Sequence, residues 1–173
     1  SVLSLAVDPS NSRKLHAIIS INRKSWYHVS EDQGINWTMV REIAGVPMNI
    51  FIDPSSPSDN RTVIITCKNS VTTRKKGQWQ TYKGVSGVKN INEYAAGFDK
   101  ESNTFILYAI SGKSYFNPEG DPSGIYYSED LGRNWENRQN DILRRRPDED
   151  RLPEWRAIAT SNLNPRIVYV SYS

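Results

Sequence analysis

The sequence is poor in the side chains that most often hold metals or form covalent cross-links. Its 173 residues include one cysteine, Cys67, and two histidines, His16 and His28. A single cysteine excludes an internal disulfide and a cysteine-rich metal site, and two scattered histidines are too few for a histidine cluster. Because Cys67 lies in an apolar run, we expect a buried, unreactive thiol. The sequence therefore predicts neither a metal site nor a cofactor.

Long apolar runs and an excess of one charge are also missing. The longest apolar stretches, around residues 63–65 and 105–110, are strand-sized, whereas a membrane helix needs about 20 residues. The net charge is +3, and basic residues alternate with acidic ones except at residues 144–146. So small an excess does not indicate nucleic acid as a partner. We therefore expect no membrane span and no nucleic-acid binding.

Two segments of eight residues nearly coincide. They are residues 30–37 (SEDQGINW) and residues 128–135 (SEDLGRNW), and six of their eight positions are identical. Their separation of 98 residues corresponds to two units of about 49, near the length of one four-stranded propeller blade. We call these segments the octads. A weaker copy at residues 72–79 keeps the glycine and the tryptophan but lacks the aspartate.

A second landmark recurs along the chain. Asp8, Asp53 and Asp99 each close an apolar stretch, and a polar turn and a β-rich run follow each of them. Helix signals are almost absent, so the pattern predicts an all-β fold with four strands per unit. The predicted units are residues 1–43, 46–85 and 88–138, followed by the first two strands of a further unit at residues 155–173.

Folding alone explains the residue types of the octads. The glycines tolerate the positive φ that a tight turn needs, and the serine and aspartate side chains can bond to turn backbone groups. The tryptophans are expected to start the next strand and to bury a large ring. These structural positions are Ser30, Asp32, Gly34, Trp37, Ser128, Asp130, Gly132 and Trp135.

The octads resemble the Asp-box, or bacterial neuraminidase repeat. Proteins with this repeat include sialidases, xyloglucan-active glycoside hydrolases, sortilin-type receptors and photosystem assembly factors. The resemblance implies a β-propeller of four-stranded blades, of which about three and a half are present, or half of a seven-bladed ring. It implies that the remaining propeller blades, on the same or another chain, are partners of this chain.

The resemblance also implies a carbohydrate-directed propeller, glycoside hydrolase-like or sugar-binding, with a glycan as ligand. The alternative is a non-catalytic scaffold or receptor module that binds protein partners. The sequence lacks the Arg-Ile-Pro element of sialidases, and residues 20–24 (SINRK) hold no acid where xyloglucan-active relatives carry one. The resemblance implies a secreted, periplasmic or lumenal location. The chain itself opens on strand-like residues without a signal peptide, as a trimmed or non-secreted form would.

Two long loops, residues 111–124 and 137–154, are predicted to emerge side by side on the face opposite the octads. Long loops on a rigid scaffold often carry function, although solvated, salt-bridged insertions are the alternative. Paired carboxylates can cleave a glycosidic bond, and guanidinium groups can clamp a carboxylated sugar. The candidate catalytic residues are Glu119, Asp121, Asp148, Glu149 and Asp150. The candidate ligand-binding residues are Arg23, Lys24, Lys113, Tyr115, Arg144 and Arg146.

Overall fold

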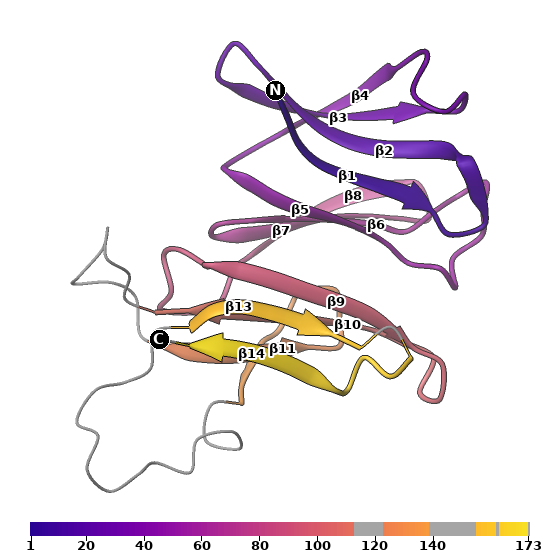
Figure 1. The fold of residues 1–173 in the computed structure, drawn as a ribbon. Helices are drawn as coiled ribbons and strands as arrows, with labels where there is room; N and C mark the ends of the chain where they lie inside the picture. The colour runs from indigo at the N-terminus through magenta and orange to yellow at the C-terminus, as the bar shows by residue number, and fades with distance from the viewer. Residues whose placement is uncertain (113–122, 139–154, 162, 173) are drawn as a thin grey trace, which may run out of the picture. The chain divides into compact units, whose positions relative to one another are not determined.

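The computed structural model describes residues 1–112, 123–138, 155–161 and 163–172. Every secondary-structure element assigned in this part of the chain is a β-strand (Figure 1). They form three four-stranded sheets and one two-stranded sheet, and each sheet is built from strands that follow one another in the sequence. The prediction of an all-β fold with four strands per sheet is confirmed. No helix in the described residues is long and apolar enough to cross a membrane.

Contacts divide the chain into two compact units, Ser1–Tyr82 and Lys83–Ser173. The first sheet comprises β1 (Val2–Asp8), β2 (Asn11–Ile21), β3 (Lys24–Ser30) and β4 (Thr38–Ile43), and the second comprises β5 (Pro47–Ile52), β6 (Val63–Cys67), β7 (Ser70–Lys75) and β8 (Gln78–Lys83). The third sheet comprises β9 (Glu93–Asp99), β10 (Thr104–Ser111), β11 (Gly124–Ser128) and β12 (Glu136–Asn137), and the two-stranded sheet comprises β13 (Trp155–Thr160) and β14 (Val168–Tyr172).

In the first unit, the core lies between the first and second sheets. Strand β6 is buried along its whole length, as its continuous apolar and β-branched sequence favours. Ile18 and Tyr27 of the first sheet pack against Ile50 and Ile65 of the second. Burial of each isoleucine stabilises the fold by about 1.5–3 kcal/mol. Cys67 belongs to the same cluster and is buried, as expected.

In the second unit, the core lies between the third sheet and the two-stranded sheet. Ile106 and Ile110 of β10 and Ile125 of β11 pack with Trp155 and Ile158 of β13. Strand β10 is also buried over nearly all its length. Burial of the large Trp155 ring fixes the start of β13 on the third sheet.

First strands of successive sheets lie beside one another in each unit. Strand β1 contacts β5, and β9 contacts β13. The backbone N–H of Ile50 donates to Ser4 Oγ at 3.1 Å, and the N–H of Ile158 donates to Glu93 Oε2 at 3.1 Å. Thr160 adds a side-chain bond to the Ala96 carbonyl at 2.9 Å. Each unit therefore joins its two sheets with a polar side chain on one first strand and a backbone N–H on the next.

The first octad forms a turn closed by its own side chains. Ser30 Oγ donates to Asp32 Oδ1 at 2.8 Å and accepts from the Gly34 N–H at 2.8 Å. Asp32 Oδ1 also accepts from the Asn36 N–H at 2.9 Å, which holds the carboxylate over the turn. Trp37 Nε1 donates to the Gly34 carbonyl at 3.0 Å. The indole is thereby held over the turn, and β4 starts at Thr38, one residue later than predicted.

The second octad repeats these contacts. Ser128 Oγ bonds to Asp130 Oδ1 at 2.9 Å and to the Gly132 N–H at 3.0 Å, and Trp135 Nε1 donates to the Gly132 carbonyl at 3.1 Å. Gly132 has φ 83° and Gly34 has φ 89°, as the turn requires. The residues before them, Gln33 and Leu131, are also left-handed, at φ 66° and 62°. Each sheet has two ends. We use the name octad end for the one where the first strand of the sheet finishes, and the name loop end for the opposite one.

Candidate functional site

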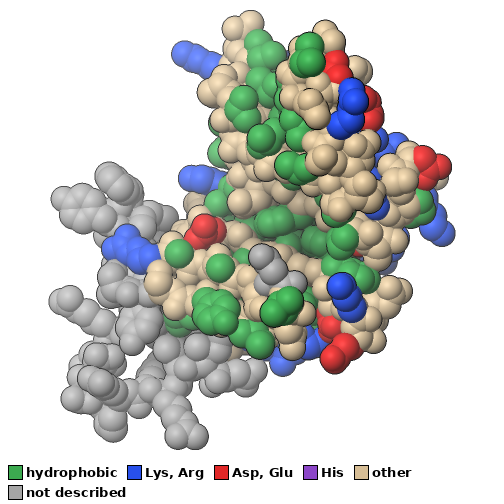
Figure 2. All heavy atoms as spheres, turned by 45° about the vertical axis from the view of Figure 1, so that its right-hand side comes forward, with side chains coloured by type: hydrophobic (Ala, Val, Ile, Leu, Met, Phe, Trp, Pro, Cys, Tyr) green, Lys and Arg blue, Asp and Glu red, His purple; other side chains and the backbone are tan. Residues whose placement is uncertain are grey.

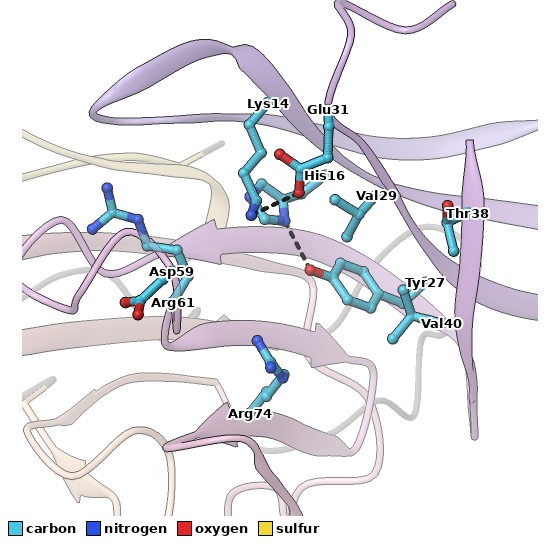
Figure 3. A pocket seen from close by; sticks show the side chains of 10 residues that line it. All are labelled: Lys14, His16, Tyr27, Val29, Glu31, Thr38, Val40, Asp59, Arg61 and Arg74. Atoms are coloured by element: carbon cyan, nitrogen blue, oxygen red, sulfur yellow. Dashed lines mark hydrogen bonds and ion pairs between the residues drawn. The ribbon is translucent and has the colours of Figure 1, made fainter. Parts of the chain in front are cut away.

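A pocket of about 310 Å³ lies between the first and second sheets, within residues 1–82 (Figure 3). Its volume is at the lower limit of small-molecule sites. It lies towards the octad end, because the segment that connects β5 to β6 and the start of β2 both contribute to its wall. The lining residues are Lys14, His16, Tyr27, Val29, Glu31, Thr38, Val40, Asp59, Arg61 and Arg74.

A buried histidine and tyrosine lie at the wall of this pocket. The His16 Nδ1 atom is 2.7 Å from Tyr27 Oη, and the two rings are nearly parallel with centroids 6.0 Å apart. His16 Nε2 lies 3.9 Å from Asp8 Oδ2 and has no hydrogen-bond partner among the described residues. Because a proton on Nε2 faces the carboxylate favourably, we assign the Tyr27 hydroxyl as the donor to Nδ1.

Burial sets the protonation of both rings. It lowers the pKa of His16 to about 4, because the charged imidazolium would lose its hydration. Burial also raises the pKa of the Tyr27 phenol well above its usual value. Both groups are therefore neutral near pH 7. The pocket is suited to hydrogen bonding rather than to proton transfer at that pH.

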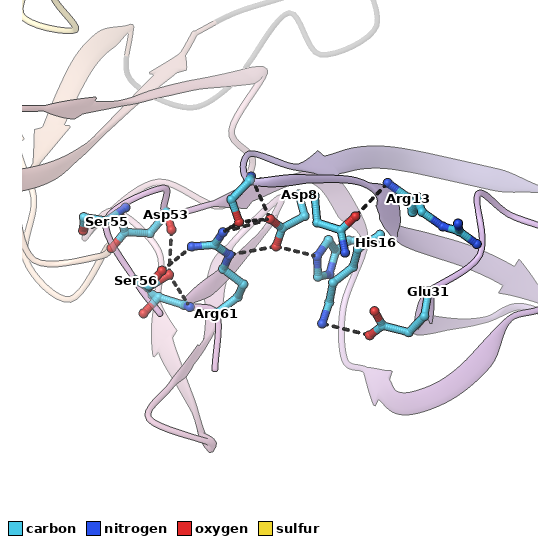
Figure 4. Close-up of polar contacts among 12 residues, drawn as sticks. Asp8, Arg13, His16, Glu31, Asp53, Ser55, Ser56 and Arg61 are labelled. Atoms are coloured by element: carbon cyan, nitrogen blue, oxygen red, sulfur yellow. Dashed lines mark hydrogen bonds and ion pairs between the residues drawn. The ribbon is translucent and has the colours of Figure 1, made fainter. Parts of the chain in front are cut away.

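Asp8 and Arg61 form a buried ion pair that joins the first two sheets (Figure 4). Arg61 Nε and one terminal nitrogen donate to the two carboxylate oxygens of Asp8 at 2.7 and 2.8 Å. The guanidinium also bonds to the Ser10 hydroxyl and the Ser56 carbonyl. Both partners are about 4% exposed or less. The paired guanidinium holds the pKa of the Asp8 carboxyl well below its usual range. We call this arrangement a clasp.

A second clasp joins the third sheet to the two-stranded sheet. Arg166 Nε donates to Asp99 Oδ2 at 2.6 Å, and a terminal nitrogen donates to Glu129 Oε1 at 3.1 Å. The Arg166 side chain is 46% exposed, whereas the Asp99 side chain is buried. In both clasps the aspartate ends the first strand of one sheet. The arginine stands two residues before the second strand of the next sheet.

Charges of both signs surround the mouth of the pocket. Lys14 Nζ pairs with Glu31 at 2.8 Å. Asp59 is exposed and Arg74 is half-buried, and Figure 3 shows the Arg74 side chain directed from β7 towards the pocket. The site therefore offers both hydrogen-bond donors and acceptors. Such a lining can hold a small polar ligand through hydrogen bonds.

Two of the sequence-predicted ligand residues lie at the loop end of the first sheet, away from this pocket. Arg23 is exposed in the turn between β2 and β3 with φ 64°. Lys24 Nζ pairs with Glu42 Oε2 at 3.2 Å on the surface. The other predicted residues lie outside the described residues, namely Lys113, Tyr115, Glu119, Asp121, Arg144, Arg146, Asp148, Glu149 and Asp150.

The described residues that flank the two long segments meet at one end of the third sheet. Ser111 pairs with Gly124 across the first segment. Arg138, just before the second segment, donates its N–H to the Ile125 carbonyl at 2.7 Å. Trp155, just after it, packs with Ile110 and Ile125. This is the loop end, opposite the second octad.

Sequence reasoning missed the clasps and the pocket. The sequence marks Asp8 only as a recurring landmark, and two scattered histidines predict no site at His16. The sequence does contain a signal for the clasps, because Arg61 and Arg166 each stand two residues before a β-rich run, β6 and β14 respectively. No sequence signal points to Arg74, since its role depends on packing between two sheets. Within the ranges that the structure covers, no group of three metal-binding side chains is present.

We expect the free energy of unfolding to fall as the pH is lowered from about 6.5 to about 4. In this window unfolded His16 takes up a proton, whereas folded His16 remains neutral. The loss amounts to about 3 kcal/mol. Below about pH 4, unfolded Asp8 also takes up a proton while the clasp keeps the folded carboxyl ionised, because its pKa is depressed in the folded state, and this adds a further loss.

Urea unfolding at a series of pH values measures this dependence. The variant His16→Gln should lose the decline between pH 6.5 and 4, while His28→Gln serves as the matched control and should keep it. An unchanged decline in His16→Gln would contradict the assignment.

Comparisons with known proteins support the fold. No family model matches the chain, and no curated protein matches it. Among solved structures, the chain is similar to an ancestral GH74 enzyme, with a TM-score of 0.62 and 20% sequence identity. The match covers 99% of this chain and 22% of that enzyme, so the chain spans about a fifth of its length. GH74 enzymes are β-propellers, and these sheets form part of a β-propeller fold.

Proposed function

We propose that the chain is part of a carbohydrate-directed β-propeller, glycoside hydrolase-like or sugar-binding. The main support is the backbone similarity to a GH74 enzyme over 99% of the chain. A fold alone is a weak guide to chemistry, so the proposal also depends on where ligand-binding groups can gather. The resemblance of the octads to the Asp-box repeat adds to this support, and with it we propose an extracytoplasmic location.

We place the glycan at the loop end of the sheets. Arg23 and Lys24 occupy this end in the first sheet, and the described residues flanking both long segments lie at this end of the third. Two of the five predicted carboxylates in those segments would act as general acid and base on a glycosidic bond. Exposed cationic side chains such as Arg23 and Lys24 would bind sugar hydroxyl or carboxylate oxygens.

A glycan array that contains plant polysaccharides and sialylated glycans tests the proposal with the 173-residue chain. We expect retention on at least one glycan class, and we expect titration calorimetry to give a saturable isotherm with the retained glycan. A folded chain that binds no glycan would contradict the proposal and favour the non-catalytic scaffold that binds protein partners. Release of reducing sugar from the retained glycan would distinguish a hydrolase from a binding module.

Substitutions at the two ends of the first unit locate the glycan. The double variant Arg23→Ala/Lys24→Ala should weaken binding about tenfold, equivalent to about 1.4 kcal/mol. Lys75→Ala, an exposed lysine at the opposite end of the second sheet, is the matched control and should bind like the original chain. If Arg74→Ala weakens binding while the double variant does not, the glycan occupies the pocket rather than the loop end.

A further inference from the structure

One face of the first sheet carries apolar side chains with nothing packed on them in the first unit. Ser4 and Ala6 of β1 face the second sheet, so the alternate residues Leu3, Leu5 and Val7 face the other way. Their exposed fractions are 43%, 55% and 52%. In Figure 2, apolar side chains gather at the upper end, where Figure 1 places the first sheet.

Equivalent positions in other sheets are covered. Leu5 stands three residues before Asp8, as Ile50 stands three before Asp53. Ile158 holds the same place in β13, three before Ser161. Ile50 and Ile158 are 5% and 6% exposed because the preceding sheet packs on them, whereas Leu5 is 55% exposed. The first sheet therefore presents a docking position that its own unit leaves open.

Arg13 supplies the charged half of a clasp at the same face. It stands two residues before Leu15, which pairs with Val7, just as Arg61 stands two before Val63, which pairs with Ile52. The Arg13 N–H is held by Asn11 Oδ1 at 3.1 Å, and the Arg166 N–H is held by Asn164 Oδ1 at 2.9 Å. The Arg13 side chain is exposed, and Figure 4 shows it directed away from the Asp8–Arg61 clasp.

We propose that Leu3, Leu5, Val7 and Arg13 form a docking surface for one further four-stranded sheet from outside these 173 residues. The first strand of that sheet ends in an aspartate, whose carboxylate pairs with Arg13 as Asp8 pairs with Arg61. Its apolar face covers Leu5 as the first sheet covers Ile50. This inference does not depend on carbohydrate binding.

The chemistry of the surface selects this occupant over a second copy of the chain. Arg13 requires an acidic partner. In a second copy, the sheet at the C-terminal end would offer its first strand, β13, which is followed by Ser161 where the other sheets have aspartate. The second sheet illustrates the required partner. Asp53 Oδ1 accepts from the Ser55 N–H at 2.9 Å, as Asp8 Oδ1 accepts from the Ser10 N–H at 2.9 Å. The same turn therefore orients both carboxylates.

A tandem protein provides the test. Residues 47–83, which contain Asp53, are placed ahead of the intact chain through a copy of residues 44–46, the natural connection between β4 and β5. In the tandem, Leu5→Ala should lower the unfolding temperature by about 5 °C, because Leu5 is now covered. In the 173-residue chain the same variant should shift it by less than about 1 °C.

Charge pairing is read from a double-mutant cycle in the tandem. One substitution is Arg13→Ala in the intact chain, and the other is Asp53→Asn in the added sheet. Their effects on the free energy of unfolding should be non-additive, whereas the effects of Arg13→Ala and Asp99→Asn should be additive. The proposal is overturned if Leu5→Ala and Arg13→Ala shift the unfolding temperature as little in the tandem as in the 173-residue chain, whether or not the added sheet folds. It is also overturned if native mass spectrometry shows a dimer of the 173-residue chain that Arg13→Ala dissociates, because the occupant is then a second copy.

Discussion

Replacing Arg61 with alanine should destabilise the chain by about 3–5 kcal/mol. The substitution leaves the Asp8 carboxylate buried without its guanidinium partner, and an unpaired buried charge is among the most destabilising defects in a protein. It also removes the bond from Arg61 to Ser10, which connects the two sheets, and the bond to the Ser56 carbonyl, which holds the connection between β5 and β6. Urea unfolding at pH 7 measures the loss.

The second clasp provides the matched control. Arg166→Ala removes the equivalent arginine, but its side chain is 46% exposed and water can solvate the remaining carboxylate. We therefore expect a loss of about 1 kcal/mol or less. Equal losses for Arg61→Ala and Arg166→Ala would contradict the assignment of the difference to burial.

Gly97→Ala should destabilise the second unit by about 1–3 kcal/mol. Gly97 lies on β9, and a Cβ atom there would meet the Cβ of Pro165 at 2.5 Å. The proline ring is buried and rigid, so the connection between β13 and β14 must move away from β9. This movement strains the bond from Thr160 Oγ1 to the Ala96 carbonyl. The unfolding temperature should fall by about 2–4 °C per kcal/mol of lost stability.

A second substitution separates this clash from other effects of a larger side chain. Pro165→Gly removes the Cβ that Gly97→Ala would strike, so Gly97→Ala should lower stability far less in that background than in the original chain. If Gly97→Ala lowers the unfolding temperature equally in both backgrounds, the close approach is not the cause. If it has no effect in either, the connection between β13 and β14 can move away from Gly97 without loss of stability.

The strands and the tight turns could be predicted from the sequence because they depend on neighbouring residues. The run of apolar and β-branched residues that becomes Val63–Cys67 predicts a strand, and β6 is that strand. Gly34 and Gly132 predict turns with positive φ, and both glycines have it. The left-handed Gln33 and Leu131 were not predicted, because neither residue type prefers that conformation.

The contacts between sheets could not be predicted in the same way. Asp8 and Arg61 are 53 residues apart in the sequence, and their pairing depends on the docking of two whole sheets. The pKa of His16 depends on the same docking, because burial beside Tyr27 is what lowers it. The predicted residues Arg23 and Lys24 were placed at the correct end of the first sheet by strand counting alone. Their part in glycan binding stays a prediction.

The interaction energy between Asp8 and Arg61 is the most direct test of how these sheets are joined. Urea unfolding of the original chain, Asp8→Asn, Arg61→Ala and the double variant gives this energy at pH 7. If the clasp joins the sheets, the sum of the stability losses of the two single variants should exceed the loss of the double variant by about 2 kcal/mol or more. Additive losses, within about 0.5 kcal/mol, would show that the two side chains do not depend on each other and would contradict the account.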